Sequence, residues 1–182
     1  MTTARLAYLG PQGTFTHQAA LALGGDCALA PMADLDAVLA ALKGGEADLA
    51  CAALDSGAGE IAATRAALDD GWAVERARTS IPVSFDLYRR RNDAGPLAGL
   101  YGHEKALAQI APWMKVRVVT GEALASNTAG LARVRDEDRP GWGAAGPPGL
   151  AAQFGLEVAA RALESPARNE TVFVLLARAD AQ

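Results

Sequence analysis

Three short segments of the sequence combine glycine with polar side chains in a way that suits the binding of an anion. Residues 10–14 and 55–59 each lie between an apolar run and a segment with helical periodicity, and Thr14 and Ser56 supply hydroxyl groups there. Glycine lets a backbone approach a ligand closely, and the free N–H groups at the start of a helix attract negative charge. Residues 102–105 form a third segment of this kind, in which a lysine can meet an anion.

Each of these segments is explained equally well by ordinary local structure. Thr14 is a good N-terminal cap for a helix, and Ser56 can act as a cap in the same way. Lys105 in the first turn of a helix is most often simply exposed to solvent. Thr171 begins the last apolar run, where threonine is usually only a residue that favours strands. Taken singly, these residues leave a binding role and a structural role both open.

The composition argues for a soluble globular protein without a nucleic-acid or membrane partner. The chain has 182 residues, of which 51% are hydrophobic and 21% charged, so it has enough apolar material for a core. Lys and Arg total 17 against 21 Asp and Glu, and no dense basic stripe is present. No apolar stretch approaches the roughly 20 residues that span a bilayer. Because the N-terminus lacks a signal-peptide pattern, we expect a cytoplasmic location.

The soft metal ligands of the sequence are few and scattered. Cys27 and Cys51 lie in separate apolar segments without C-x-x-C spacing, and His17 and His103 are the only histidines. Disulfides are also rare in cytoplasmic proteins. We therefore expect two buried free thiols and no metal site.

Short apolar runs alternate with segments of helical periodicity along the whole chain, which predicts an α/β fold with mainly parallel strands. The predicted helices are 16–23, 35–43, 59–68, 104–110, 128–134 and 150–154. The predicted strands are 5–9, 27–30, 47–53, 72–78, 83–89, 100–101, 115–119, 142–145, 156–160 and 171–177.

The same pattern divides the chain into two α/β lobes. Pro82 can switch the direction of the chain between two strand-like stretches. We therefore expect the first lobe to contain residues 1–78 plus 169–182 and the second to contain residues 79–168. Two connections of this kind leave a cleft between the lobes, and small ligands usually bind in such clefts.

The polar segments follow the order of five patterns that characterise one known enzyme family. The pattern G-P-x-G-T-[FY] matches residues 10–15 in full, and V-P-I-E-N-S-x-x-G-x-V aligns with residues 51–61. S-H-P-Q-A-L aligns with residues 102–107, S-T-A with 127–129 and N-x-T-R-F with 169–173. Through this order of motifs, nearly the whole chain resembles the catalytic domain of the prephenate dehydratase family.

The resemblance implies two Rossmann-like α/β subdomains, similar to type II periplasmic binding proteins, with the substrate held between them. It implies conversion of prephenate to phenylpyruvate with loss of water and carbon dioxide, without a cofactor, and with Thr171 as the catalytic residue. The expected partner is a small-molecule carboxylate, and a homodimer is a further implication. Because the chain stops at Gln182, we expect no C-terminal regulatory domain. The substrate-binding residues implied are Gly13, Thr14, Asp55, Ser56, His103, Lys105, Thr128 and Phe173.

Three positions depart from the family patterns, and each changes the polarity of the expected site. Leu54 stands where the family has glutamate, Asp55 where it has asparagine and Val172 where it has arginine. Two negative charges about 4 Å apart repel by roughly 4 kcal/mol at an effective dielectric of 20, so Asp55 would oppose a substrate carboxylate. Loss of the arginine removes a fixed cation as well.

Three functions are compatible with these departures. The site still dehydrates prephenate, or it handles a related substrate or a non-aromatising decarboxylation in secondary metabolism, or the fold survives as a binding module for small anions. Retention of Thr171 and of residues 10–15 favours the first of these. Lys105, Arg65 and Arg168 are the candidates for a cation that replaces the arginine, and the sequence leaves the choice among them open.

Overall fold

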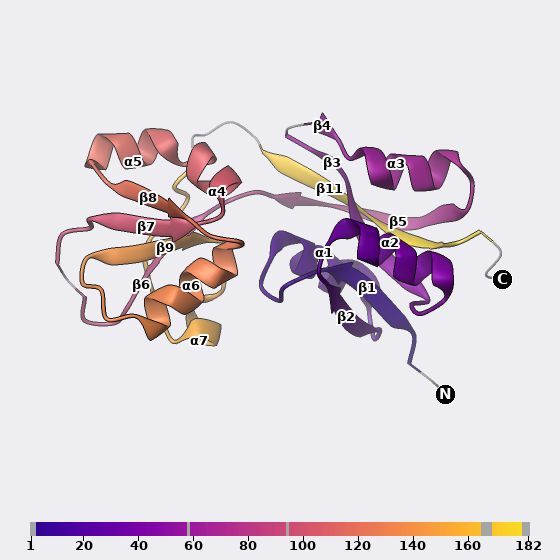
Figure 1. Ribbon diagram of the computed structural model, residues 1–182, viewed down its shortest axis with the longest axis horizontal. Coiled ribbons are helices and arrows are strands. Elements are labelled where there is room, and N and C mark those ends of the chain that lie inside the picture. The colour runs from indigo at the N-terminus through magenta and orange to yellow at the C-terminus, as the bar shows by residue number, and fades with distance from the viewer. Residues whose placement is uncertain (1–2, 58, 94, 165–168, 180–182) are drawn as a thin grey trace. The chain divides into compact units, whose positions relative to one another are not determined.

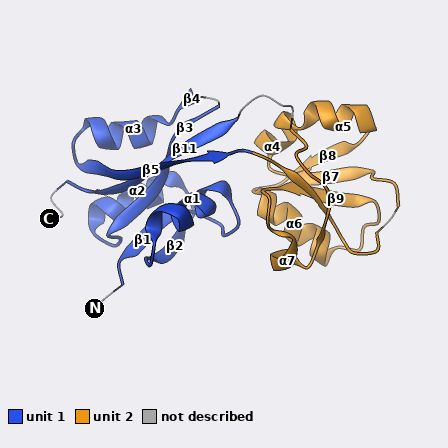
Figure 2. Ribbon diagram, turned by 180° about the vertical axis from the view of Figure 1, so that it is seen from behind, with its two compact units in different colours: residues 1–83, 169–182 blue, residues 84–168 orange. Residues whose placement is uncertain are grey.

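The computed structural model describes residues 3–57, 59–93, 95–164 and 169–179. The chain forms two compact units, which are coloured separately in Figure 2. Unit 1 consists of Met1–Val83 and Asn169–Gln182, and unit 2 consists of Ser84–Arg168.

Unit 1 extends further along the chain than the sequence led us to expect. The first segment ends at Val83 instead of residue 78, because the strand β5 (Ala73–Pro82) stays paired with β11 (Glu170–Arg178) along its whole length. Pro82 lies opposite Glu170 at the last position of this pairing. β5 is an edge strand, where proline is tolerated because no further strand needs its missing N–H.

The sheet of unit 1 has the strand order β2-β1-β3-β11-β5, with the short strand β4 paired to β3. Its central strand β3 (Leu49–Ser56) runs parallel to β1 (Arg5–Leu9), and β1 is also parallel to β2 (Ala28–Met32). β11 runs antiparallel to both of its neighbours, and β4 (Gly59–Glu60) is antiparallel to β3. The start of β11 therefore lies beside the end of β3 (Figure 1).

Three helices cover the sheet of unit 1 on its two faces: α1 (Phe15–Gly24), α2 (Leu35–Gly44) and α3 (Ala62–Asp69). Because successive strand residues point to opposite faces, each strand contributes to two clusters of buried side chains. We call the cluster beneath α1 the α1-face cluster; its buried members are Leu6, Tyr8, Ala19, Ala20, Cys51, Phe173 and Leu175. The cluster on the other face packs against α2 and α3 and includes Ala7, Val38, Leu42, Ala52, Leu54, Ala67, Val174 and Leu176.

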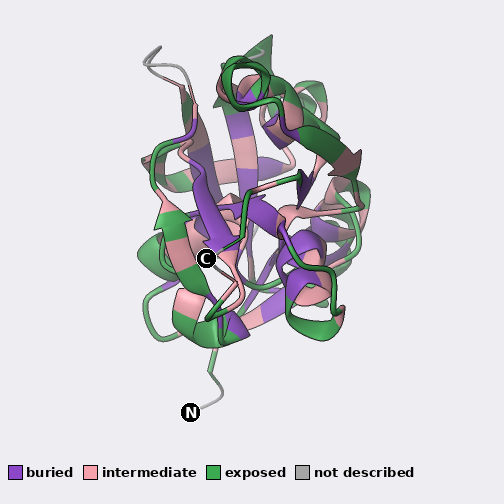
Figure 3. Ribbon diagram, turned by 90° about the vertical axis from the view of Figure 1, so that its left-hand side faces the viewer, coloured by how far each residue is buried: buried purple, intermediate pink, exposed green. Residues whose placement is uncertain are grey.

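The sheet of unit 2 has the strand order β10-β6-β9-β7-β8. Its strands are β6 (Asp86–Arg89), β7 (Gly99–Gly102), β8 (Thr120–Ala123), β9 (Trp142–Gly146) and β10 (Glu157–Ala160). β7 is parallel to β8 and β9, whereas β6 is antiparallel to β9 and β10. The helices are α4 (Glu104–Gln109), α5 (Ala111–Arg117), α6 (Asn127–Asp136) and α7 (Ala151–Phe154). Figure 3 shows how the buried residues concentrate on strands and on the inner sides of helices.

The expectation of mainly parallel strands is wrong, because both sheets are mixed. In unit 1 the chain leaves through β5 and returns through β11, and these two strands pair with each other in opposite directions. The apolar runs that form them look the same in either direction. Of the described helices, none has the length and apolar character to cross a membrane.

The predicted strand at residues 115–119 is also wrong. Residues up to Arg117 belong to α5, which has Pro112 in its first turn and buries Met114. Val116 and Val118 are 80% and 88% exposed, so these β-branched residues do not form a buried strand. The strand β8 begins only at Thr120.

Candidate functional site

Three of the motif segments meet at one edge of the unit 1 sheet. β1 and β3 are parallel and end at the same edge, and β11 begins there because it runs the opposite way. Val172 lies opposite Asp55, and Phe173 lies opposite Ala53. Residues 10–14 follow β1 at the same edge. In open α/β sheets, ligands bind outside the carboxyl ends of the parallel strands, which makes this edge the candidate site of unit 1.

Close packing joins the end of β3 to the start of β11. A side-chain carbon at Gly57 would clash with Oδ1 of Asn169. The space beside this backbone position is therefore filled by the asparagine side chain. Glycine at position 57 permits the two motif segments to pack together.

The loop of residues 10–14 is held by hydrogen bonds to β2, to α1 and within itself. The Gly10 N–H donates to the Met32 carbonyl at 2.9 Å, which ties the loop to β2. Thr14 caps α1: its hydroxyl oxygen accepts from the His17 N–H at 3.2 Å and its hydroxyl donates to the Pro11 carbonyl at 3.0 Å. The Gly13 N–H donates to Nδ1 of His17 at 3.1 Å. The capping role of Thr14 is thus present, and anion binding by Gly13 and Thr14 stays a prediction.

His17 is a residue that the sequence analysis did not connect with this loop. It lies three positions after Thr14, the spacing at which a glutamate or glutamine completes a capping box. Here an imidazole takes that place, and it bonds Gly13, the residue before the cap. The ring also packs against Tyr8, with 5.4 Å between ring centroids. Burial lowers the pKa of His17 below its ordinary value of 6.5.

Leu54 and Asp55, which depart from the family pattern at the end of β3, differ in exposure. Leu54 is 4% exposed and belongs to the cluster against α2 and α3, so an apolar contact replaces the carboxylate of the family pattern. Asp55 is exposed and lies opposite Val172, at the register irregularity of the β3–β11 ladder. Its carboxylate forms no hydrogen bond or ion pair with another residue that the structure describes. The Ser56 hydroxyl donates to the Gly59 carbonyl at 3.2 Å.

Thr171 and Phe173 lie on the same side of the sheet but differ in exposure. Thr171 is opposite Ile81, which packs at the margin of the α1-face cluster, and residues opposite each other in an antiparallel pair share a face. Its side chain is half-buried, and its hydroxyl has no partner among the described residues. Phe173 is 2% exposed inside the α1-face cluster, so the structure gives it a core position.

The remaining predicted residues gather at one edge of the unit 2 sheet. β7 and β8 are parallel, and α4 and α6 begin where these strands end. His103 caps α4: its Nδ1 accepts from the Lys105 N–H at 3.3 Å. The His103 N–H donates to Oδ1 of Asn127 at 2.8 Å, which links the starts of the two helices. Asn127 aligns with the S-T-A pattern, but no feature of the sequence indicates this bond.

Thr128 lies next to Asn127 and is 5% exposed. Its hydroxyl is 3.0 Å from that of Ser126, which caps α6 by accepting from the Ala129 N–H at 3.0 Å. The lysine of this edge, Lys105, is exposed, and its ammonium group has no partner among the residues described.

Of the three candidate cations, Lys105 belongs to unit 2 and its ammonium group has no partner among the described residues. Arg65 is bonded to Glu60, and both side chains are half-exposed. Arg168 lies outside the described residues. The family arginine is therefore not replaced by Arg65, whose charge is already matched by a neighbouring carboxylate.

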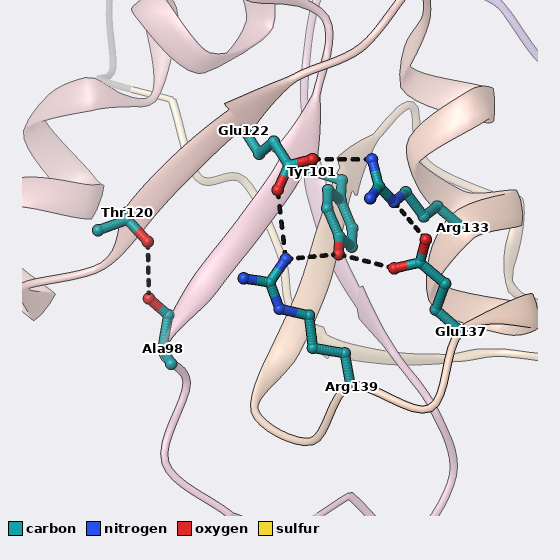
Figure 4. Close-up of polar contacts among 7 residues, drawn as sticks. All are labelled: Ala98, Tyr101, Thr120, Glu122, Arg133, Glu137 and Arg139. Atoms are coloured by element: carbon teal, nitrogen blue, oxygen red, sulfur yellow. Dashed lines mark hydrogen bonds and ion pairs between the residues drawn. The ribbon is translucent and has the colours of Figure 1, made fainter.

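Unit 2 also contains a polar cluster around Tyr101, shown in Figure 4. Arg133 donates to Glu122 and Glu137 at 2.7 and 2.6 Å, and Arg139 donates to the Tyr101 hydroxyl at 3.0 Å and to Glu122 at 3.2 Å. The charges of the two arginines are balanced by these two carboxylates. The cluster joins the last turn of α6 to β7 and β8, whereas the candidate edge lies at the start of that helix. Its arginines are therefore already paired and do not serve a ligand at the edge.

No metal-binding group is evident in the part of the chain that the structure describes: no three His, Cys, Asp or Glu side chains gather there. Cys27 and Cys51 are free thiols, and Cys51 is buried. Burial raises the pKa of Cys51 to about 12, which keeps it protonated and unreactive.

Comparison with known proteins identifies the family. The family model for prephenate dehydratase matches residues 6–181. The prephenate dehydratase of Amycolatopsis methanolica is 33% identical over 135 residues, which cover 71% of this chain and 43% of that protein. The crystal structure of the Arthrobacter aurescens prephenate dehydratase in complex with L-Phe is 27% identical, has a TM-score of 0.82 and covers 96% of this chain and 60% of that one.

A methionine-bound nutrient-binding protein from Burkholderia cenocepacia shares the fold at 12% identity, with a TM-score of 0.50, and covers 97% of this chain and 85% of that one. The two-subdomain α/β architecture related to periplasmic binding proteins is thereby confirmed. The chain spans about half the length of the curated relatives that it matches. Since the family model extends over nearly all of it, the chain belongs to the prephenate dehydratase family.

Proposed function

We propose that the chain is a prephenate dehydratase-like lyase, which converts prephenate to phenylpyruvate, water and carbon dioxide in phenylalanine biosynthesis. The observation that carries the proposal is the hydroxyl of Thr171, which has no partner among the described residues and lies at the edge where the motif loops of unit 1 end. Membership of the family supports the same reaction class.

The reaction requires few catalytic groups from the protein. As the ring carboxylate leaves as carbon dioxide, the electrons of the broken C–C bond enter the ring, and the C–O bond to the ring hydroxyl breaks. The leaving oxygen takes up one proton and departs as water. A hydrogen bond from Thr171 to that oxygen stabilises the negative charge that develops on it. Threonine is a weak acid in water, so its effect depends on orientation and on the drive of the ring to become aromatic.

The substrate's carboxylates need donors or a cation. In unit 2, we assign this role to Lys105, whose ammonium group is free among the described residues, together with His103 and Thr128 at the same edge. In unit 1, Ser56 and the loop of residues 10–14 border the edge that carries Thr171. Gly13 and Thr14 act there mainly by fixing the loop, because the Gly13 N–H already donates to His17 and the Thr14 hydroxyl to Pro11.

A second candidate function rests on the pair Asp55 and Val172. These two departures from the family pattern lie directly opposite each other on β3 and β11, next to Thr171. A negative charge has been gained and a positive one lost at the same point of the sheet. This change opposes binding of the dianion prephenate at this point. The alternatives are a related decarboxylase, or a module that binds small anions through donors elsewhere in the chain.

One experiment separates these functions. The purified chain is incubated with prephenate at neutral pH, samples are made alkaline, and phenylpyruvate is followed by its absorbance, while binding is measured separately by calorimetry. Formation of phenylpyruvate above the spontaneous rate supports the lyase. Saturable binding without turnover supports the binding module. The absence of both rules out prephenate as the ligand.

A further inference from the structure

We propose that His17 is a positioning residue, which holds the loop of residues 10–14 in its ligand-ready shape by accepting the Gly13 N–H at Nδ1. The proposal rests on the proposed function only in that this loop borders the ligand site of unit 1. His17 lies within α1 and is not assigned a contact with the ligand.

The geometry ties His17 to the loop at two points. Its backbone N–H donates to Oγ1 of Thr14 at 3.2 Å, and its imidazole accepts from the Gly13 N–H at 3.1 Å. Gly13 has a φ of 87°, in the left-handed region that glycine adopts most easily. An internal bond at this residue therefore selects one of several shapes that a glycine backbone can take.

The bond to Gly13 also fixes the proton of the imidazole. A ring nitrogen accepts a hydrogen bond only when it carries no proton, so neutral His17 holds its proton on Nε2. The imidazolium form is protonated on both nitrogens and cannot accept from Gly13. Addition of one proton to His17 therefore breaks this bond, while the cap formed by Thr14 remains.

The surroundings of His17 favour the neutral ring. The His17 ring lies against Tyr8 of β1, with 5.4 Å between ring centroids, and Cys51 of β3 is buried on the same side of the sheet. β5, which also packs against α1, carries Glu75, Arg76 and Arg78. Burial raises the pKa of both Tyr8 and Cys51, so neither carries charge near neutral pH. The pKa of His17 is lowered by burial of the ring, which disfavours the charged form.

Two substitutions at one position separate the hydrogen bond from the bulk of the side chain. His17→Asn keeps an acceptor, since the amide oxygen is as far from the backbone as Nδ1, and it does not titrate. His17→Leu keeps a side chain of comparable size and removes the acceptor. Circular dichroism and urea unfolding of both variants check that the fold is kept.

The first measurement needs no ligand. Amide exchange of Gly13 is followed by NMR and corrected for the intrinsic rate at each pH. We expect protection of Gly13 to fall by roughly ten-fold in His17→Leu and to stay near the parent level in His17→Asn. In the parent, protection of Gly13 falls as the imidazole becomes protonated, and the ¹⁵N shifts of the imidazole report that protonation. In His17→Asn, protection of Gly13 does not depend on pH in this way. If His17→Leu fails to fold, this comparison of parent and His17→Asn still decides the question.

The second measurement is titration with prephenate. We expect binding in His17→Leu to weaken by roughly three- to ten-fold, the worth of one hydrogen bond, and His17→Asn to recover most of it. Unchanged Gly13 exchange in His17→Leu, or an Nδ1–H tautomer in the parent, overturns the role of His17. If the parent does not bind prephenate, the proposed function fails, and the exchange data still decide whether His17 holds the loop.

Discussion

At the scale of single residues, two threonines of unit 1 differ in exposure. One hydroxyl is buried and lowers stability, and the other is accessible to a ligand. Thr64 in α3 is fully buried, and its hydroxyl has no hydrogen-bond partner among the described residues. A buried hydroxyl without a partner destabilises the fold by about 1–3 kcal/mol. Thr171 is half-buried at the edge of the sheet, where its hydroxyl stays within reach of a ligand. Of these two residues, only Thr171 is therefore in a position to contact a ligand.

Replacement of Thr171 by valine tests this assignment. Valine keeps the shape and the preference for strands but removes the hydroxyl. We expect turnover of prephenate to fall by about 100-fold or more, the scale for loss of one donor to a developing charge, with little change in substrate affinity. Steady-state rates of phenylpyruvate formation measure both. Thr120→Val, at the start of β8, serves as a control and leaves turnover unchanged. Full activity of Thr171→Val removes this hydroxyl from the mechanism.

For Thr64, the expected effect concerns stability alone. Thr64→Val exchanges an unsatisfied hydroxyl for a methyl group of the same shape. The free energy of unfolding in urea should stay the same or rise by up to about 1 kcal/mol. Catalytic turnover should not change. A loss of more than about 1 kcal/mol would mean that the hydroxyl has a partner in solution.

At the scale of elements, the pairing of β3 with β11 explains why substitutions far apart in the sequence act together. Asp55 and Val172 are distant along the chain, yet they are opposite each other in the ladder. A register irregularity between Val172 and Phe173 lies at the same point. An arginine at position 172 would therefore place a cation opposite Asp55, whereas Val172 does not.

This pairing predicts the outcome of restoring the family residues. Asp55→Asn removes a negative charge and should tighten prephenate binding by roughly two- to five-fold, a modest gain because Asp55 is exposed and water screens its charge. Adding Val172→Arg should improve binding further, since a guanidinium can bind a carboxylate through two hydrogen bonds.

Calorimetric titration of the two single variants and the double variant measures these gains. The effects should not be additive, because the two side chains are cross-strand neighbours. Val172→Arg alone should gain less than it does in combination with Asp55→Asn, since in the parent background the carboxylate of Asp55 competes for the new cation. If the double variant binds prephenate no better than the parent, the site has been rebuilt around another ligand.

At the scale of the whole molecule, sequence patterns predicted the α/β class and the two-subdomain fold. The G-P-x-G-T-F segment follows β1, and the last strand joins the sheet of the first unit, as expected. The direction of β11 could not be predicted, because an apolar run such as residues 172–177 reads alike in both directions. α5 was missed because valines at positions 116 and 118 mimic a strand while the helix buries Met114 instead.

The polar contacts within the site were the least predictable part. The bond between Asn127 and the His103 backbone joins two segments that are far apart in the sequence, and no local pattern indicates it. The bond between His17 and Gly13 was more predictable from the sequence, because the Thr14-x-x-His17 spacing is that of a capping box. Such contacts depend on backbone geometry that becomes defined only when the fold is complete.

The stability of the whole chain should depend on pH through the half-buried His17. Its pKa in the folded protein lies below the ordinary value of 6.5 that applies to the unfolded chain, so the unfolded chain binds more protons as the solution is acidified. This contribution is fully present above pH 6.5 and is lost as the pH falls through the lowered pKa of the folded state. Urea unfolding at a series of pH values on both sides of 6.5, followed by circular dichroism, measures it.

His17→Asn should remove this part of the pH dependence, because asparagine does not titrate. Carboxylates elsewhere contribute their own slope at lower pH, so the informative quantity is the difference between parent and variant at each pH. That difference should be constant above pH 6.5 and should shift in favour of the variant as the pH falls below it. A difference that stays constant over the whole range would show that His17 titrates alike in the folded and unfolded chain, and the bond to Gly13 would then not depend on a buried, neutral imidazole.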